Sequence, residues 1–348
     1  MNLPVQPPLA PMLGRLVRAL PREDGFYYEP KWDGFRCLVF RDGDEIDLRS
    51  RHDRPLARYF PELVEAVRAL TAERFVLDGE IVVVTPRGFD FPALMARLHP
   101  AASRVERLRS ETPALLIAFD VLAVGDEDLR PRPFSERREA LVELVASAEP
   151  PVLLTPATDD AACAAEWLER FEGVMAKHAG SRYEPGARAM LKIKAERTAD
   201  CVVAGFRWLF EKPLPSSLLL GLYDDEGRLQ HVGVASSFTE RQRERLLEEL
   251  APLVVPLEGH PWEGGFLVDG GPVGRLKGAA GRWTPEMERD WVPVAPTRVC
   301  EVAYDQLDRD RFRHPARFRR WRPDREPASC TFAQLETMPL ELGELLAQ

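Results

Sequence analysis

Residues 28–36 read Tyr-Glu-Pro-Lys-Trp-Asp-Gly-Phe-Arg, and this stretch decides how the rest of the chain is interpreted. A lysine amine is nucleophilic only when it is neutral, a state favoured by burial and by neighbouring cations, which lower a lysine's pKa. Gly34 would let the backbone approach a ligand closely, and Arg36 could reach a phosphate or a ribose. The stretch therefore predicts either a reactive, phosphate-facing Lys31 or a surface hairpin in which Arg36 pairs with Asp33.

The composition is that of a globular protein with room for two domains, since 45% of its 348 residues are hydrophobic and 30% are charged. No uninterrupted apolar run approaches the roughly 20 residues of a membrane span. The first residues, MNLPVQPPLAPML, lack the basic start and continuous apolar core of a signal peptide. We therefore expect a cytoplasmic protein with no membrane partner.

Charge and cysteine content narrow the classes further. The net charge of −9 and the pI near 5.4 exclude a uniformly basic surface, so nucleic-acid binding would depend on where the basic residues cluster. Five cysteines are widely spaced along the chain without a CxxC pair. This argues against a disulfide framework and a zinc site, and we expect reduced, partly buried thiols.

The pattern after residue 26 predicts a mixed α/β domain, with residues 1–26 as a short lead-in. A hairpin is expected from residue 27 to 51 because an Asp-Gly turn separates two alternating runs. Helical spacing and capping residues, Ser135 among them, predict helices at 59–70, 91–98, 103–108, 135–147 and 163–171. Apolar runs predict further strands at 74–84, 114–124, 172–178 and 189–194.

After Lys194 the pattern changes to short alternating strands with a single predicted helix at 239–254. A small antiparallel barrel such as an OB-fold fits this pattern. We therefore predict an α+β protein in which a domain of antiparallel sheets and flanking helices, residues 1–197, is followed by an OB-fold β-barrel domain with a C-terminal tail, residues 198–348.

Several polar groups could accompany Lys31. Asp78 and Glu80 bracket a glycine at the start of an apolar strand, where Glu80 could bind a ribose hydroxyl or a divalent cation, or both acids could lie in a solvated turn. Glu172 and Lys177 flank an apolar step at Val174-Met175, although Glu172 could merely end the preceding helix. Lys192 and Lys194 alternate along one strand, so both amines can meet a single anion or lie at a solvated edge.

A second basic cluster lies near the end of the chain. Residues 309–325 hold eight arginines against two acids, interleaved with aromatic residues. This arrangement suits phosphate binding, although a basic surface strand would look the same.

In order and content these segments resemble the motifs of the covalent nucleotidyltransferases, which include ATP- and NAD-dependent DNA ligases, RNA ligases and mRNA capping enzymes. The stretch K-W-D-G-F-R resembles motif I, whose lysine forms a phosphoramide bond to a nucleotide. Ser50-Arg51, D-G-E, Phe119-Asp120, E-G-V-M-A-K, L-K-I-K and R-P-D-R resemble motifs Ia, III, IIIa, IV, V and VI.

The resemblance implies roles for individual residues. Lys31 would be the catalytic nucleophile, and Glu80 and Glu172 would bind the metal. Phe119 would stack on the purine, and Met175 would pack against it. The nucleotide-binding residues implied are Glu29, Lys31, Arg36, Arg51, Glu80, Phe119, Met175, Arg188, Lys192, Lys194, Arg322 and Asp324. Two positions depart from the pattern, since Asp53 replaces the glycine of motif Ia and Arg325 replaces the lysine of motif VI.

Among these families the chain looks most like the minimal bacterial C-type ATP-dependent DNA ligases in its EPKWDGFR start, its VVAGF segment and its RFRH…RFRRWRPDR ending. The four-cysteine zinc finger of NAD-dependent ligases and the large N-terminal domain of eukaryotic ligases have no counterpart in the pattern. The resemblance implies sealing of 5′-phosphate/3′-hydroxyl nicks in duplex DNA through a lysyl-AMP on Lys31 and an adenylated DNA end. It further implies ATP with Mg²⁺ or Mn²⁺, a monomer in the bacterial cytosol or nucleoid, a role in DNA repair, repair polymerase or primase partners, and a hinge just after Lys194.

Three alternatives stay open at this point. An RNA ligase or a GTP-dependent capping-type nucleotidyltransferase would share the lysine motif and the barrel. An inactive nucleic-acid-binding relative would keep the barrel and lose the chemistry.

Overall fold

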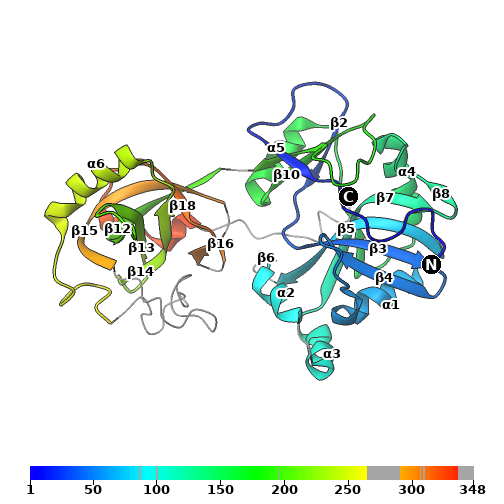
Figure 1. Ribbon diagram of the computed structural model, residues 1–348, viewed down its shortest axis with the longest axis horizontal. Coiled ribbons are helices and arrows are strands. Elements are labelled where there is room, and N and C mark those ends of the chain that lie inside the picture. Colours follow the sequence, from blue (N-terminus) through cyan, green and yellow to red (C-terminus); the bar gives the residue numbers. More distant parts are fainter. Residues whose placement is uncertain are drawn as a thin grey trace. The chain divides into compact units, whose positions relative to one another are not determined.

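The computed structural model describes residues 1–85, 88–98, 101–194, 196–264, 291–305, 307–308 and 310–335. The chain forms two compact units, and the second starts at Glu196, where we predicted residue 198 (Figure 1). The predicted hinge after Lys194 and the C-terminal tail lie outside the described residues, as do the tip of the turn at 85–88 and Arg309 of the basic cluster.

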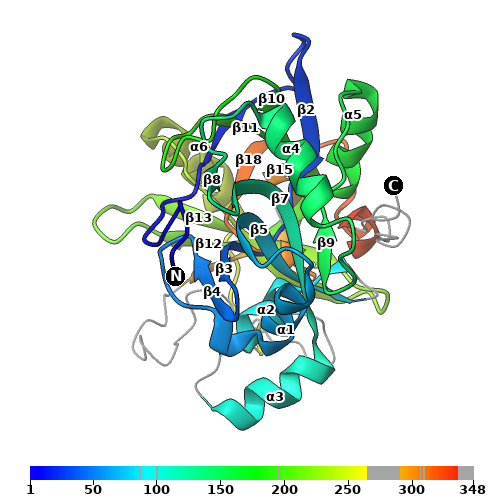
Figure 2. The same cartoon turned by 90° about the vertical axis from the view of Figure 1, so that its right-hand side faces the viewer.

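The first unit is built on a large sheet. Its strands are β3 (Phe35–Asp42), β4 (Glu45–Ser50), β5 (Arg74–Thr85), β6 (Gly88–Phe89), β7 (Ala114–Val124), β8 (Glu127–Asp128) and β9 (Val152–Leu154). They run in the order β4-β3-β5-β7-β8, with β6 paired to β5 and β9 to β7. The helices are α1 (Pro61–Ala69), α2 (Phe91–Arg97), α3 (Ala102–Glu111) and α4 (Phe134–Leu144), with a 3₁₀ turn at Ala57–Tyr59. Helices α1, α2 and α4 bury Leu63, Leu94 and Leu141 against one face of the sheet (Figure 2).

A smaller sheet covers part of the other face. It is formed by β1 (Gly14–Val17), β2 (Phe26–Pro30), β10 (Gly173–His178) and β11 (Met190–Lys194), in the order β1-β11-β10-β2. Helix α5 (Ala161–Arg170) packs Trp167 into a core shared by the two sheets, to which β5 contributes Val82 and β10 contributes Val174. The candidate site lies where these two sheets meet.

The predicted helices and strands of this unit are confirmed, with four corrections. The hairpin predicted over 27–51 is formed by β3 and β4 alone, since β2 pairs with β10 in the smaller sheet. Residues 1–26 are more than a lead-in, because Leu3, Val5 and Met12 are buried in a core with Phe40 of the large sheet. Pairing is not entirely antiparallel, since β1 runs parallel to β11 and β7 parallel to β9. Helix α4 starts at Phe134 without a side-chain cap, so the predicted cap at Ser135 is wrong.

The second unit is a closed barrel. Its strands are β12 (Arg197–Trp208), β13 (Pro215–Tyr223), β14 (Leu229–Ser236), β15 (Trp291–Tyr304) and β18 (Ala316–Trp321), with a small pair β16 (Leu307–Asp308) and β17 (Arg311–Phe312). The barrel closes in the order β12-β13-β14-β18-β15, and the small helix α6 (Glu240–Leu250) follows its third strand. Further 3₁₀ turns lie at Ala251–Leu253, Pro327–Ser329 and Phe332–Leu335. This is the predicted OB-fold architecture, but the barrel is not wholly antiparallel as predicted, because β14 and β18 pair in parallel.

The sequence predicted reduced, partly buried thiols and no membrane span. Cysteines far apart in sequence come together in the barrel core, where Cys201, Cys300 and Cys330 are buried and free. Burial raises the pKa of the Cys201 thiol well above its ordinary value. Among the helices that the structure describes, none is long and apolar enough to cross a membrane.

Candidate active site

A pocket of about 240 Å³ lies between the two sheets of the first unit. The residues that line it come from both sheets and from the segment before β1. They are Leu13, Gly14, Glu29, Pro30, Lys31, Trp32, Arg36, Arg51, Glu80, Phe119, Met175, Lys177, Arg188, Met190 and Lys192. Nine of the predicted nucleotide-binding residues are among them: Glu29, Lys31, Arg36, Arg51, Glu80, Phe119, Met175, Arg188 and Lys192.

The Lys-Trp-Asp-Gly segment connects β2 to β3 and is fixed by its backbone and by Trp32. The backbone N–H of Lys31 donates to the carbonyl of Gly173 at 2.9 Å. Trp32 is buried, and its indole N–H donates to Thr155 Oγ1 at 2.9 Å. A Cβ added at Gly34 would lie 2.0 Å from the carbonyl oxygen of Ile81 on β5, so the close approach of the neighbouring strand requires glycine here. The alternative of a surface hairpin is therefore wrong.

Glu172 contacts both Lys31 and Lys194 of β11. Strand β10 lies between β2 and β11, and it pairs Val174 with Pro30 and Gly173 with Lys194. This register places the amine of Lys31 against Glu172 Oε2, while Lys194 Nζ contacts Glu172 Oε1 at 2.8 Å. Burial alone would raise the pKa of Glu172, but the two lysines lower it below its ordinary value. The carboxylate is thus charged and shared.

Lys192 lies one alternation from Lys194 on β11 and lines the pocket. Its pKa is lowered by burial and, next, by the positive charges of Lys194 and Lys31. An anion entering the pocket would relieve this repulsion. The prediction that the β11 lysines share one face is confirmed in geometry, although Lys194 itself contacts Glu172 and does not line the pocket.

Arg36 is held by a buried carboxylate. Its Nε and Nη2 atoms both donate to Asp78 at 2.5 Å, and Nη2 also donates to the carbonyl of Met12 at 3.1 Å. The Tyr183 hydroxyl donates to Asp78 at 2.6 Å and accepts from the N–H of Met12 at 3.0 Å. Asp78 is fully buried within β5, so the alternative of a solvated turn is wrong for this acid. The guanidinium lies over the Phe119 ring, 4.5 Å from its centre.

Glu80 lies on the same strand, and its pKa is shifted towards neutral pH. Burial raises its pKa to about 7, although Arg36 and Lys31 both act to lower it. A carboxyl group in this state can donate to or accept from a hydroxyl, and it becomes a charged oxygen ligand when a cation approaches.

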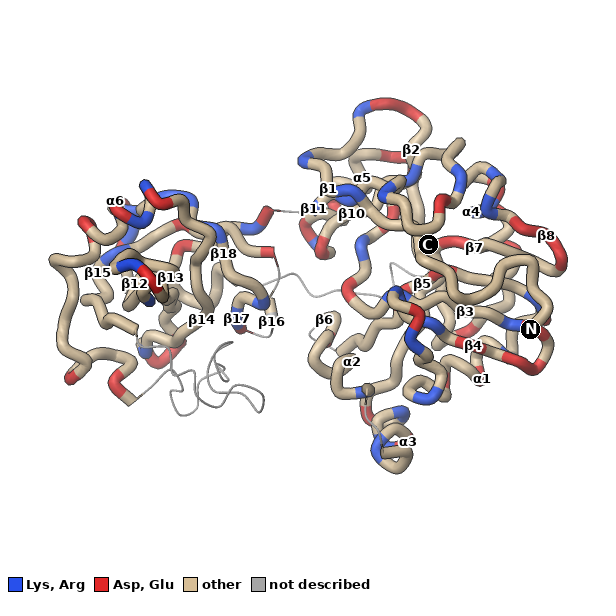
Figure 3. Tube along the Cα trace, in the orientation of Figure 1, with Lys and Arg blue, Asp and Glu red and all other residues tan. Residues whose placement is uncertain are grey.

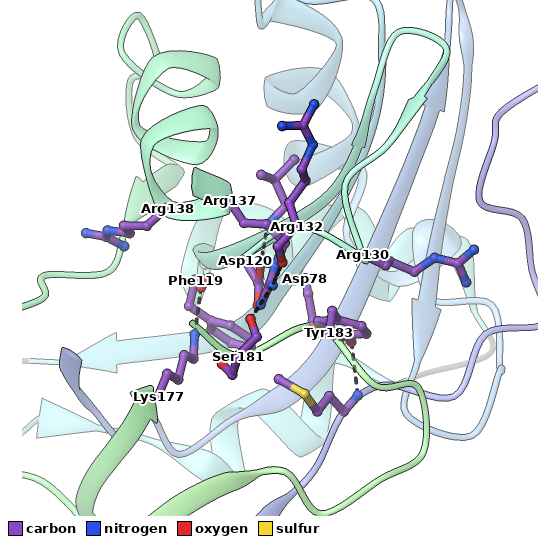
Figure 4. Close-up of polar contacts among 12 residues, drawn as sticks. Asp78, Phe119, Asp120, Arg130, Arg132, Arg137, Arg138, Lys177, Ser181 and Tyr183 are labelled. Carbon is purple, nitrogen blue, oxygen red and sulfur yellow. Dashed lines mark hydrogen bonds and ion pairs between the residues drawn. The ribbon is translucent and has the colours of Figure 1, made fainter. Parts of the chain in front are cut away.

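A buried lysine, Lys177, also lines the pocket. Lys177 Nζ contacts Glu29 Oε2 and the Phe119 carbonyl oxygen, each at 2.7 Å, and lies 4.8 Å from the centre of the Phe119 ring (Figure 4). Glu29 is 2% exposed, and its Oε1 atom accepts no hydrogen bond from the residues that the structure describes, while Arg138 Nη1 lies 3.9 Å away. Burial raises the pKa of Glu29, while Lys177 and Arg138 lower it.

These contacts show what sequence reasoning missed. Lys177 ends the E-G-V-M-A-K segment and was not expected to line the pocket. Leu13 and Gly14 line it as well, although the first 26 residues were interpreted as a lead-in. The available signal for Lys177 was a lysine inside an apolar strand, which needs a buried acid as partner.

Arg51 and Arg188 are exposed residues of the pocket wall. Arg51 precedes the turn in which Asp53 replaces the expected glycine. Asp53 has a φ of +56°, in the left-handed region, and its N–H donates to the Ser50 carbonyl at 2.9 Å. Aspartate tolerates this region better than most residues, so the substitution preserves the turn.

The predicted residues of the last motif lie in the barrel unit. Arg322 donates to Asp324 through Nε at 2.9 Å and through Nη2 at 2.8 Å. Its Nη1 atom donates to both oxygens of Asp200 at 2.9 Å. Figure 3 shows basic residues along β18, which carries Arg317, Arg319 and Arg320. Arg322 lowers the pKa of Asp324 to about 2.

The predicted metal ligands fit a cation that arrives with its substrate. No group of three or more His, Cys, Asp or Glu side chains is placed to hold a metal ion among the described residues. Mg²⁺, however, usually keeps several waters and binds through one or two carboxylates plus substrate phosphates. Glu80 and Glu172 supply oxygen donors of this kind beside the Lys31 amine.

A pocket that combines a lysine amine with further cations, in a two-sheet unit followed by an OB-fold barrel, defines a nucleotidyltransferase. Residues 7–194 match the family model described as "ATP dependent DNA ligase domain", and residues 211–325 match that of the "ATP dependent DNA ligase C terminal region". The chain belongs to the ATP-dependent DNA ligases.

Relatives support the assignment over nearly the whole chain. The chain is 51% identical to DNA ligase C of Mycobacterium tuberculosis, over 97% of its own length and 96% of that protein. It is 50% identical to DNA ligase C2 of Mycolicibacterium smegmatis, over 97% of both chains. A solved structure from a study of Lig E DNA ligases aligns with 89% of this chain and 99% of its own, at 16% identity and a TM-score of 0.50, which shows likeness of fold alone.

Proposed function

We propose that Lys31 carries AMP during the joining of nicks in duplex DNA. The observation that carries this proposal is the position of its amine, beside Glu172 in a pocket lined by Arg36, Arg188 and Lys192. The family uses ATP and a divalent metal, and the residues of the pocket fit both.

In the first step the Lys31 nitrogen attacks the α-phosphorus of ATP. The N–P bond forms, the bond to the β-phosphate oxygen breaks, and pyrophosphate leaves with the electron pair. Glu172 accepts a hydrogen bond from the amine and can take the proton that the nitrogen loses. Lys192 and Lys194 offset the charge that develops on the phosphate. Mg²⁺, bound through Glu80 and Glu172, would supply further charge neutralisation.

In the second step an oxygen of the DNA 5′-phosphate attacks the AMP phosphorus and the N–P bond breaks. In the third step the 3′-hydroxyl attacks the activated 5′-phosphorus, the strands are joined, and AMP leaves. The mycobacterial relatives are named DNA ligases, which supports DNA as the substrate. We also propose that the enzyme works as a cytoplasmic monomer in DNA repair, alongside a repair polymerase or primase.

Glu29 Oε1 is buried and accepts no hydrogen bond from the described part of the chain, which supports adenine over guanine. A buried acceptor costs free energy unless a donor meets it, and the amino group of adenine is such a donor. Guanine presents a carbonyl oxygen at the corresponding position, so two acceptors would face each other. A site built to hydrogen-bond its substrate rejects an analogue that lacks the donor by large factors.

Labelling with α-labelled nucleotides tests the proposal. We expect label from ATP, and not from GTP, to become covalently attached to the protein and to be released by pyrophosphate. The labelled protein should then seal a nick that carries a 5′-phosphate in duplex DNA, while a nick with a 5′-hydroxyl serves as the control. Selective labelling by GTP, or transfer to RNA ends alone, would favour a capping enzyme or an RNA ligase.

Glu29→Gln tests the nucleobase contact separately. The amide can donate as well as accept, so we expect kcat/KM for ATP in the labelling step to fall and the preference for ATP over GTP to narrow by about 10-fold or more. Glu184→Gln, at an exposed position, is the control. An unchanged preference would remove Glu29 from the nucleobase site without touching the role of Lys31.

A further inference from the structure

Tyr183 is not one of the residues that line the nucleotide pocket, but its hydroxyl belongs to a closed network of hydrogen bonds that reaches the pocket through Arg36. The hydroxyl donates to Asp78 Oδ2 at 2.6 Å and accepts from the N–H of Met12 at 3.0 Å (Figure 4). Arg36 Nη2 completes the network, because it donates to the same Asp78 oxygen at 2.5 Å and to the carbonyl of Met12 at 3.1 Å. The Tyr183 hydroxyl therefore joins β5 to the segment before β1.

This network determines which atom of Arg36 can meet a ligand. The Nε and Nη2 atoms donate to Asp78 and Met12, and only 18% of the Arg36 side chain is exposed. The guanidinium also lies over the ring of Phe119, another residue of the pocket wall. None of the residues that the structure describes accepts from Nη1. This nitrogen is thus the one that Arg36 can offer to an oxygen of a nucleotide in the pocket.

Tyr183 is held in place independently of this network. Its backbone N–H donates to the carbonyl of Arg130 at 2.9 Å. Two residues earlier, the Ser181 carbonyl accepts from Arg137 Nη1 at 3.0 Å. Arg137 is fully buried and forms a fork on Asp120, with distances of 2.8 and 3.0 Å (Figure 4). The hydroxyl therefore comes from a fixed segment, so it can orient a flexible side chain that it contacts.

We propose that Tyr183 is a positioning residue for the adenylation of Lys31. By fixing Asp78 and Met12, its hydroxyl directs Arg36 Nη1 towards an oxygen of ATP. The inference rests on the proposed function, because the step that it affects is the formation of lysyl-AMP. Burial raises the pKa of the Tyr183 hydroxyl well above its ordinary value, so the group remains a donor at neutral pH.

The hydroxyl affects both stability and orientation. A buried network that loses one member is costly, because the remaining polar groups lose partners. Without the hydroxyl, Asp78 Oδ2 keeps only the bond from Arg36, and the N–H of Met12 loses its acceptor. Relaxation of either residue would move Arg36, since both accept from its Nη2 atom. Loss of activity alone therefore does not distinguish a positioning role from a structural one.

Tyr183→Phe tests the proposal in the full-length protein. Covalent labelling is followed over a range of concentrations of α-labelled ATP, which gives the half-saturating concentration and the fraction of protein that becomes labelled. We expect the half-saturating concentration to rise by about 10-fold, because a hydrogen bond from a charged group to ATP is weakened, and the labelled fraction to stay within about 2-fold. A merely structural role would lower the labelled fraction instead. Tyr59→Phe, in the same unit and outside the pocket, is the control and should change neither quantity.

A double-mutant cycle with Arg36 identifies the route by which Tyr183 acts. In an Arg36→Ala background, Tyr183→Phe should raise the half-saturating ATP concentration by less than about 2-fold, because the group through which it acts is gone. An equal rise in both backgrounds would overturn the positioning role, as would an unchanged concentration when Arg36 is intact.

If Tyr183→Phe fails to fold, Arg36→Lys replaces it. Lysine keeps the charge beside Asp78 but has no second nitrogen to present to the pocket. A rise of about 10-fold in the half-saturating ATP concentration supports the proposal, and an unchanged concentration overturns it. Failure of the wild-type protein to form any lysyl-AMP would instead overturn the proposed function.

Discussion

Both units gather basic residues, but the surroundings of these residues differ. In the first unit, Lys31 and Lys194 share a single carboxylate, Glu172, while Lys192 and the exposed Arg51 and Arg188 line the pocket. Along β18 of the barrel, Arg317, Arg319 and Arg320 each contact a carboxylate of the protein. The comparison teaches that the pocket is preorganised for a polyanion, whereas a phosphate reaching the barrel must compete with acids of the protein.

The largest effect should come from removing the amine of Lys31, the proposed nucleophile. For Lys31→Ala we expect lysyl-AMP formation and nick sealing from ATP to fall by about 10⁴-fold or more, because no other group supplies the covalent bond. Quantitative labelling with α-labelled ATP measures this. Sealing of a pre-adenylated nick, which bypasses the first step, should persist in the same variant. Substantial sealing from ATP without Lys31 would contradict the mechanism.

The next effect concerns stability and not rate. Asp78→Asn leaves the Arg36 charge without its buried partner, so we expect the free energy of unfolding to fall by about 3–5 kcal/mol. Asp126→Asn, which removes one exposed partner of Arg74, should change the free energy of unfolding far less. Denaturant titration of both variants checks the contrast. Equal losses would mean that burial of the Asp78 carboxylate does not govern its contribution.

Glu80 gives a smaller effect that depends on pH. Its pKa is raised by burial to about 7, so the folded state keeps a proton that the unfolded chain releases. Stability should therefore fall as pH rises from about 4.5 to 7, and this group contributes at most about 3 kcal/mol. Glu80→Gln should match the wild type near pH 4.5 and be the more stable protein at pH 7.5. The opposite sign in paired thermal melts would contradict the raised pKa.

The smallest effect concerns the barrel arginines. Glu196 contacts both Arg317 and Arg319 at the surface, so Glu196→Gln should strengthen binding to duplex DNA by about 2- to 5-fold at low salt and steepen the salt dependence. Glu226→Gln, which removes a partner of Arg228 elsewhere on the barrel, is the matched control. Fluorescence anisotropy measures both. If the two variants bind DNA equally, the acids of the barrel do not compete with phosphate at β18.

Sequence reasoning predicted the pocket well because its residues occur in motifs with fixed local spacing. The strand alternation that placed Lys192 beside Lys194, and the turn that placed Lys31 before a strand, are short-range properties. The roles of these side chains towards the nucleotide stay predictions. The first 26 residues could not be predicted in this way, since Leu3, Val5 and Met12 lie among prolines without helical or strand periodicity.

Contacts that depend on the register between strands far apart in sequence could not be predicted either. Asp200 meets Glu301 only because β12 and β15 pair in one register, and Gln334 reaches Asp200 from a later turn. In the same way, Cys201 lies opposite Cys300 although the two are far apart in the chain. Nothing in the local sequence of Asp78 shows that Tyr183 and Met12 will surround it.

The parallel pairing of β1 with β11 has a consequence for how the molecule is made. Gly14 lies beside Met190, so the pocket wall formed by Leu13 and Gly14 needs a strand that leaves the ribosome much later. Pairing across such a sequence separation is slow compared with local contacts. A nascent chain can therefore complete its nucleotide pocket only after β11 has emerged, and acquisition of tight ATP binding would mark the moment at which the first unit closes during synthesis.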